Sequence, residues 1–148
     1  MKLKKSHLGV GALALGGVLA FAVPAGAAVN LQSESGAGSA VKIVKTAKLK
    51  ARGAATEVTV SVTCPSGGRF YLYVDVTQTV SPTTTTHGSG HLTNQYCTGF
   101  AENVKVPVTA GGAPFKLGVA YAVGELDVNT NQGYFTLNTG REIVNVNN

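Results

Sequence analysis

The sequence predicts an all-β protein, an antiparallel immunoglobulin-like sandwich of about seven strands with one disulfide. Apolar and polar side chains alternate along several short segments, as they do in strands that bury one face. Turn-forming residues separate these segments at regular spacing, and no helical pattern follows residue 27. A small closed barrel is the architectural alternative.

The start of the chain predicts export. A basic start at residues 2–5, an uncharged run at 8–23 and small residues at 25–27 make up the three parts of a secretory signal peptide. A membrane anchor is the alternative, but the run is shorter than the roughly 20 residues that a spanning helix needs. Residues 1–27 are therefore predicted to be removed. We expect a secreted, extracellular protein that begins near Ala28, without stable membrane insertion after cleavage.

The remainder is predicted to be one domain. Residues 28–40 are small and polar and are interpreted as a flexible leader to an immunoglobulin-like domain at 41–148. After residue 27 the chain has nine basic and seven acidic side chains, a weak positive charge that does not indicate nucleic acid as a partner. Five of the basic residues lie between Lys42 and Arg52. They are interpreted as the wet face of an edge strand, where lysines discourage pairing; a patch for anionic wall polymer or lipid head groups is the alternative.

The predicted strands begin at residues 47–52, where basic and apolar side chains alternate. The clearest strands follow, and their expected inward rows are Val58, Val60 and Val62, then Phe70, Leu72, Val74 and Val76, then Val104, Val106 and Val108. Less regular strands are predicted at 92–97, 115–128, 134–137 and 142–146, with a bulge near Gly118 or Gly124. Loops or turns are predicted at 65–68, 81–90, 111–114, 129–133 and 138–140.

Cys64 and Cys97 are the only cysteines. Two cysteines in an exported chain are expected to pair, so we predict a disulfide between them. Neither cysteine lies in a C-x-x-C motif or has a histidine at ligand spacing, which disfavours a metal or redox pair.

Several of these motifs resemble a known group. The order V-T-V-S-V-T-C (58–64), V-D-V-T-Q (74–78), G-S-G (88–90) and C-T-G (97–99), followed by a V-x-V-x-V strand, is similar to small secreted bacterial proteins with a single immunoglobulin-like sandwich, mostly of unknown function. The architecture is also loosely similar to that of the neocarzinostatin type, although those proteins have two disulfides. The first resemblance implies the fold and leaves the function open. The second implies a small-ligand carrier with a pocket between sheets.

Few residues indicate chemistry. His87 and His91 are four apart, a spacing that holds metals on helices, but the glycines between them disfavour a helix, so no metal or other cofactor is predicted. The acids are scattered, and no catalytic residue is assigned. Tyr71 and Tyr73 share the expected outer side of a strand and are the candidate partner-binding residues.

The leading hypothesis is a secreted, non-enzymatic sandwich with a binding or structural role at or outside the cell surface. Its partner would be an unknown protein or a cell-wall component, and loops at 81–92 and 129–133 would carry specificity. A carrier with a cleft bordered by Phe115, Tyr121 or Tyr134 is the first alternative. A metal-dependent or hydrolytic enzyme is the second, and it would need His87, His91 and a carboxylate to converge.

Overall fold

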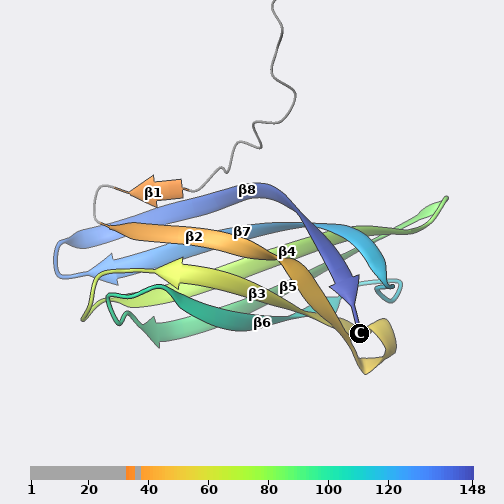
Figure 1. Ribbon diagram of the computed structural model, residues 1–148, viewed down its shortest axis with the longest axis horizontal. Helices are drawn as coiled ribbons and strands as arrows, with labels where there is room; N and C mark the ends of the chain where they lie inside the picture. The colour runs from red at the N-terminus through yellow and green to blue at the C-terminus, as the bar shows by residue number, and fades with distance from the viewer. Residues whose placement is uncertain (1–32, 36–37) are drawn as a thin grey trace, which may run out of the picture.

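The computed structural model describes residues 33–35 and 38–148, so the predicted signal peptide lies outside the described residues. The described residues form eight strands and one short 3-10 turn, η1 (Ala51–Gly53) (Figure 1). The strands are β1 (Ser33–Ser35), β2 (Ser39–Lys50), β3 (Ala55–Thr63), β4 (Arg69–Ser81), β5 (Thr84–Tyr96), β6 (Glu102–Ala110), β7 (Gly118–Thr130) and β8 (Gly133–Asn147). Strand β1 and the start of β2 fall inside the range interpreted as a leader. In this part of the chain no helix has the length and apolar character to cross a membrane.

The strands close into a barrel. Their order is β1-β2-β3-β6-β5-β4-β7-β8, and β8 returns to pair with β2. This closing contact is parallel and joins residues 46–48 to 145–147, whereas the other neighbouring strands pair antiparallel. Residues 39–147 therefore form a closed mixed barrel of seven strands, and β1 pairs with β2 at residues 39–41.

The predicted immunoglobulin-like sandwich is wrong, and the closed barrel is the observed architecture. Strands alternate apolar and polar residues whether two sheets stack or one sheet closes on itself. Alternation alone cannot separate the two architectures. What decides between them is the pairing of β2 with β8, the first and last strands of the ring, and this contact leaves no local signal in the sequence.

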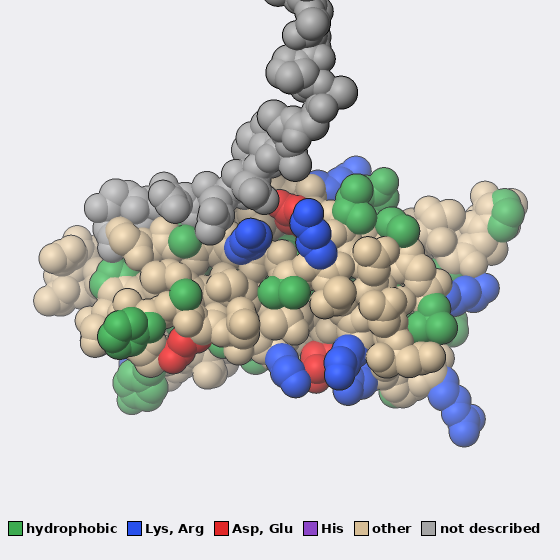
Figure 2. All heavy atoms as spheres, viewed as in Figure 1, with side chains coloured by type: hydrophobic (Ala, Val, Ile, Leu, Met, Phe, Trp, Pro, Cys, Tyr) green, Lys and Arg blue, Asp and Glu red, His purple; other side chains and the backbone are tan. Residues whose placement is uncertain are grey.

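The strand that carries the lysines, β2, is not the edge of an open sheet. It pairs with β3 at residues 40–43 and 47–50, and its other side pairs with β1 at 39–41 and with β8 at 46–48. Figure 2 shows the side of the barrel that carries β8, β2, β3 and β6, where several Lys and Arg side chains project into solvent. Protection of a free edge therefore does not account for Lys48.

The barrel interior is filled by the rows of side chains that alternate inward. The inward rows predicted for β3 and β4 are confirmed, and each of their residues is at most 2 % exposed. Phe115, between β6 and β7, is also buried, and its backbone N–H donates to the carbonyl of Gly53 at 2.8 Å. This ring thus lies in the core near the η1 end of the barrel.

Residues 81–90, predicted as a loop, belong mainly to β5, so that prediction is wrong. The inward positions of this half of β5 are Thr86, Gly88 and Gly90. A Cβ on Gly90 would overlap the carbonyl oxygen of Pro107, and one on Gly88 would lie 2.8 Å from the ring of Phe115. The strand passes so close to β6 and the core that large inward side chains do not fit, and the resulting composition resembles that of a loop.

The predicted irregularity in β7 is confirmed. The register between β7 and β8 shifts between Val123 and Glu125, which places a bulge at Gly124. The N–H of Gly124 donates to the Thr139 hydroxyl at 2.9 Å, so the group freed by the bulge is satisfied inside the barrel.

The predicted disulfide between Cys64 and Cys97 is confirmed. It joins the residue after β3 to the residue after β5, beyond the end of β6, which separates these strands in the sheet order. Strands β5 and β6 share only two register pairs, Gly88 with Ala110 and Ser89 with Thr109. The covalent bond therefore holds the end of β5 where its ladder to β6 is absent.

Candidate functional site

The two histidines of the H-G-S-G-H segment lie apart on β5. His87, Ser89 and His91 project outward, because the residues between them face the interior. Four residues of an extended strand span about 13 Å, so the two imidazoles are not brought together. Among the described residues no group of three or more His, Cys, Asp or Glu side chains is placed to hold a metal ion.

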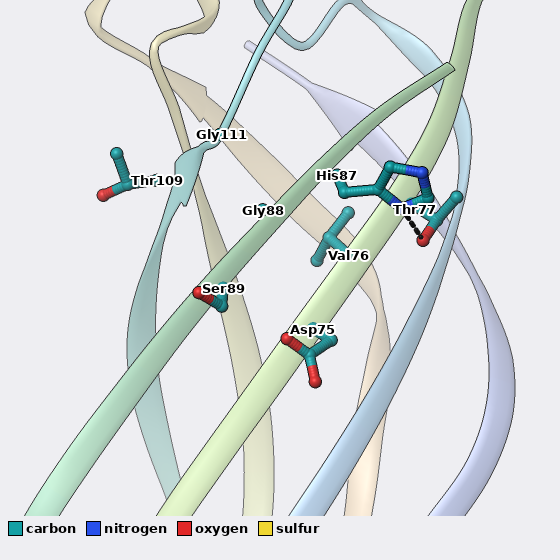
Figure 3. A pocket seen from close by; sticks show the side chains of 8 residues that line it. All are labelled: Asp75, Val76, Thr77, His87, Gly88, Ser89, Thr109 and Gly111. Carbon is teal, nitrogen blue, oxygen red and sulfur yellow. Dashed lines mark hydrogen bonds between the residues drawn. The ribbon is translucent and has the colours of Figure 1, made fainter.

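A shallow hollow of about 350 Å³ lies beside His87 and is lined by residues of β4, β5 and the end of β6 (Figure 3). Asp75 and Ser89 are direct register partners across β4 and β5. His87 Nδ1 is hydrogen bonded to the hydroxyl of Thr77 at 3.0 Å. The imidazole is thus engaged with Thr77 and not with Ser89, and the Ser–His contact that activates a nucleophile is not formed.

The outward side of β5, β4, β7 and β8 gathers every tyrosine of the chain. Tyr71 and Tyr73, the candidate partner-binding residues, lie on this side because they alternate with buried residues of β4. Strand order adds Tyr96 on β5, together with Tyr121 on β7 and Tyr134 on β8, which were expected to border a ligand cleft. We call these five residues the tyrosine face. All except Tyr71 are between 42 % and 68 % exposed.

Polar groups are interleaved with the tyrosines. Tyr73 has His91 as its register partner on β5 and Glu125 on β7, and the centroids of the Tyr73 and His91 rings are 6.2 Å apart. Tyr71 has Asp127 as its partner on β7. Ring faces, carboxylates and an imidazole therefore lie side by side on one surface.

Asp127 links two neighbours on β8. Its carboxylate accepts a hydrogen bond from the Thr136 hydroxyl at 2.5 Å. The nearby Asp127 carboxylate is the main cause that raises the pKa of Tyr134 above the ordinary value of 10.0. The pKa rises because the carboxylate favours the neutral phenol as a hydrogen-bond donor and repels the phenolate.

Two arginines lie over tyrosine rings. The guanidinium carbon of Arg69 is 4.0 Å from the ring centroid of Tyr96, and that of Arg141 is 5.5 Å from the ring of Tyr121. Arg69 also donates to the Tyr96 hydroxyl at 2.6 Å. These contacts restrict the two outer rings by cation–π attraction.

The three residues expected to border a ligand cleft do not share one. Phe115 is buried in the core, whereas Tyr121 and Tyr134 project from the outer surface. Large side chains, including Phe70, Leu72 and Leu126, occupy the interior. These three residues therefore do not border an internal pocket of the kind that a small-ligand carrier needs.

Comparison with models of protein families, with curated proteins and with solved structures gives no match to this chain. The resemblance to small secreted bacterial proteins stays a prediction, and the closed barrel replaces the sandwich that it implied.

Proposed function

We propose that the protein is a secreted, non-enzymatic binding protein that acts outside the cell, and that the tyrosine face is its surface for a cell-wall glycan. The observation that carries this proposal is the position of all five tyrosines on one side of the barrel. Tyrosine offers a large rigid ring for contact and a hydroxyl that stays hydrogen bonded, at little cost in side-chain entropy.

The chemistry around the rings supports a glycan as the occupant. Sugars present C–H faces that stack on aromatic rings, and their hydroxyls donate to carboxylates and amides. The register neighbours of the tyrosines supply such acceptors, among them Glu125, Asp127 and Asn129. The rings are spread over four strands rather than gathered in one cavity, which suits an extended polymer better than a small molecule.

Export is supported by the pattern of residues 1–27 and by the disulfide, since disulfides persist in oxidising compartments. The test is to recover the protein from the medium of a bacterial culture and sequence its N-terminus. We expect a chain that starts at Ala28 and has no free thiol. A chain that stays inside the cell with its first residues intact would contradict export.

Binding is tested by co-sedimentation of the folded, oxidised protein with insoluble peptidoglycan, chitin and cellulose. We expect retention on at least one of these, and we expect Tyr73→Ala to weaken it about tenfold. Phe100→Ala is the matched control, because Phe100 is an exposed aromatic outside the four strands. Absence of retention on all three glycans, or equal weakening by the two substitutions, would refute the glycan surface.

A further inference from the structure

The other side of the barrel has a different chemistry. Strand β2 carries four exposed lysines, Lys42, Lys45, Lys48 and Lys50, which we call the lysine row. Lys105, on the outer side of β6, adds a fifth positive charge to this side. Two glutamates, Glu57 on β3 and Glu102 at the start of β6, are the acids of the strands β2, β3 and β6.

No lysine of the row forms an ion pair within residues 38–148, although Glu142 on β8 lies beside Lys45. Within residues 38–148 the ion pair found is that of Lys105 with Glu57, at 3.5 Å. Lys48 is the register partner of Glu57, yet the carboxylate is held by Lys105 instead. The row therefore concentrates positive potential along β2.

The usual structural explanation also fails at Lys48. Lysines on a β-strand commonly block pairing at a free edge. At Lys48 the strand has β3 on one side and β8 on the other, so no edge is left there to protect. Four like charges on one strand repel each other, and a binding role would account for their retention.

We propose that the lysine row binds an extended linear polyanion that carries phosphate groups. Residues 42–50 span about 26 Å of extended chain, so the ammonium groups form a line along which successive phosphates can lie. Each lysine acts as a flexible point charge, and binding releases the counterions of the polymer.

The surroundings of the row favour a polymer over a membrane. The large apolar side chains that are exposed lie on β4, β5, β7, β8 and the segments on either side of β6, and none lies on β2, β3 or β6 themselves. Stable attachment to a lipid surface needs apolar side chains that enter the interface beside the basic ones. One exposed apolar side chain, Ile143 on β8, lies beside Lys45, whereas β2, β3 and β6 offer charge without large exposed apolar side chains.

The experiment measures binding of the oxidised protein to labelled long-chain inorganic polyphosphate over a series of salt concentrations. We expect binding that weakens steadily with salt, and we expect Lys48→Glu to weaken it about tenfold. Lys116→Glu is the matched control: it makes the same charge change at an exposed lysine between β6 and β7, and we expect a change below about twofold. Unfolding midpoints of both variants establish that they are folded.

Three outcomes would overturn the proposal: no binding to polyphosphate, equal weakening by the two substitutions, or tighter binding to vesicles of anionic phospholipid than to polyphosphate. The last outcome would identify a membrane as the partner. Tyr73→Ala is expected to leave polyphosphate binding unchanged, so failure of the glycan proposal and failure of this one are separately visible.

Discussion

Strand β4 pairs with β7 on one side and with β5 on the other, and the two neighbours hold it differently. Strand β7 presents Leu126 and Val128 to the interior, both fully buried. Strand β5 presents Thr86, Gly88 and Gly90. The β7 side is therefore stabilised by packing of large side chains, whereas on the β5 side the inward glycines let β5 lie close to β6 and Phe115, and a disulfide is nearby. Two strands that pair with the same neighbour can thus be stabilised differently, one by side-chain packing and the other by close backbone approach.

The largest expected effect is that of Gly90→Ala. The added Cβ would overlap the carbonyl oxygen of Pro107, and backbone in a closed wall has no flexible end that can move away. We expect a loss of more than about 4 kcal/mol of stability, measured by urea unfolding. Gly112→Ala is the control, because nothing lies within 4 Å of its Cβ position. Similar midpoints for the two variants would show that the β5 wall yields, and the comparison would fail.

Loss of the disulfide is expected to come next. The bond closes a loop with a sequence separation of 33, and its removal by Cys64→Ser with Cys97→Ser should cost roughly 3.5 to 4 kcal/mol. The effect should also be uneven, because the bond holds the end of β5. Hydrogen exchange should quicken first at residues 91–96, with the amides between β4 and β7 still protected. A uniform rise in exchange along both sides of β4 would contradict this.

This difference between the sides of β4 also explains what the sequence predicted. Val58 and Leu72 were assigned to the core because large inward residues alternate with polar ones. The same rule failed on β5, where Gly88 and Gly90 occupy inward positions and give the composition of a loop. Closure of the barrel could not be predicted, because the β2–β8 contact joins the two ends of the domain.

The tyrosine face was predicted only in part, because part of it depends on the order of the strands in the closed barrel. The outward direction of Tyr71 and Tyr73 follows from alternation within one strand. The position of Tyr121 and Tyr134 on the same side of the barrel depends on the order β4-β7-β8, which is a property of the whole sheet. The local signal was an outward tyrosine in each of these later strands.

A pair of leucines tests the comparison within one row. Leu72 on β4 has Leu126 as its register partner on β7 and Leu92 on β5. Leu126 is fully buried, whereas Leu92 is only partly buried against the core. We expect Leu126→Ala to cost about 3 kcal/mol and Leu92→Ala about 1 kcal/mol in urea unfolding. Equal losses would mean that packing contributes alike on both sides of β4.

The smallest expected effect concerns the outer surface on the β7 side, where side chains also contact each other directly. Asp127 raises the pKa of Tyr134, so an ultraviolet titration should show a late step from this residue, above the ordinary value of 10.0. A pKa raised in the folded state favours folding below the unfolded pKa, and this contribution is lost as the pH rises through the folded one. Tyr134→Phe should remove the late step.

Asp127→Asn tests the cause of that step. It should return the late ionisation towards 10.0, because the carboxylate that repels the phenolate is gone. Asp75→Asn makes the same charge change on β4, farther along the same surface, and should leave the late step in place. If both substitutions lower the pKa of Tyr134 equally, the overall charge of the surface controls its titration. Direct contact between neighbouring side chains would then not distinguish the β7 side of β4 from the β5 side.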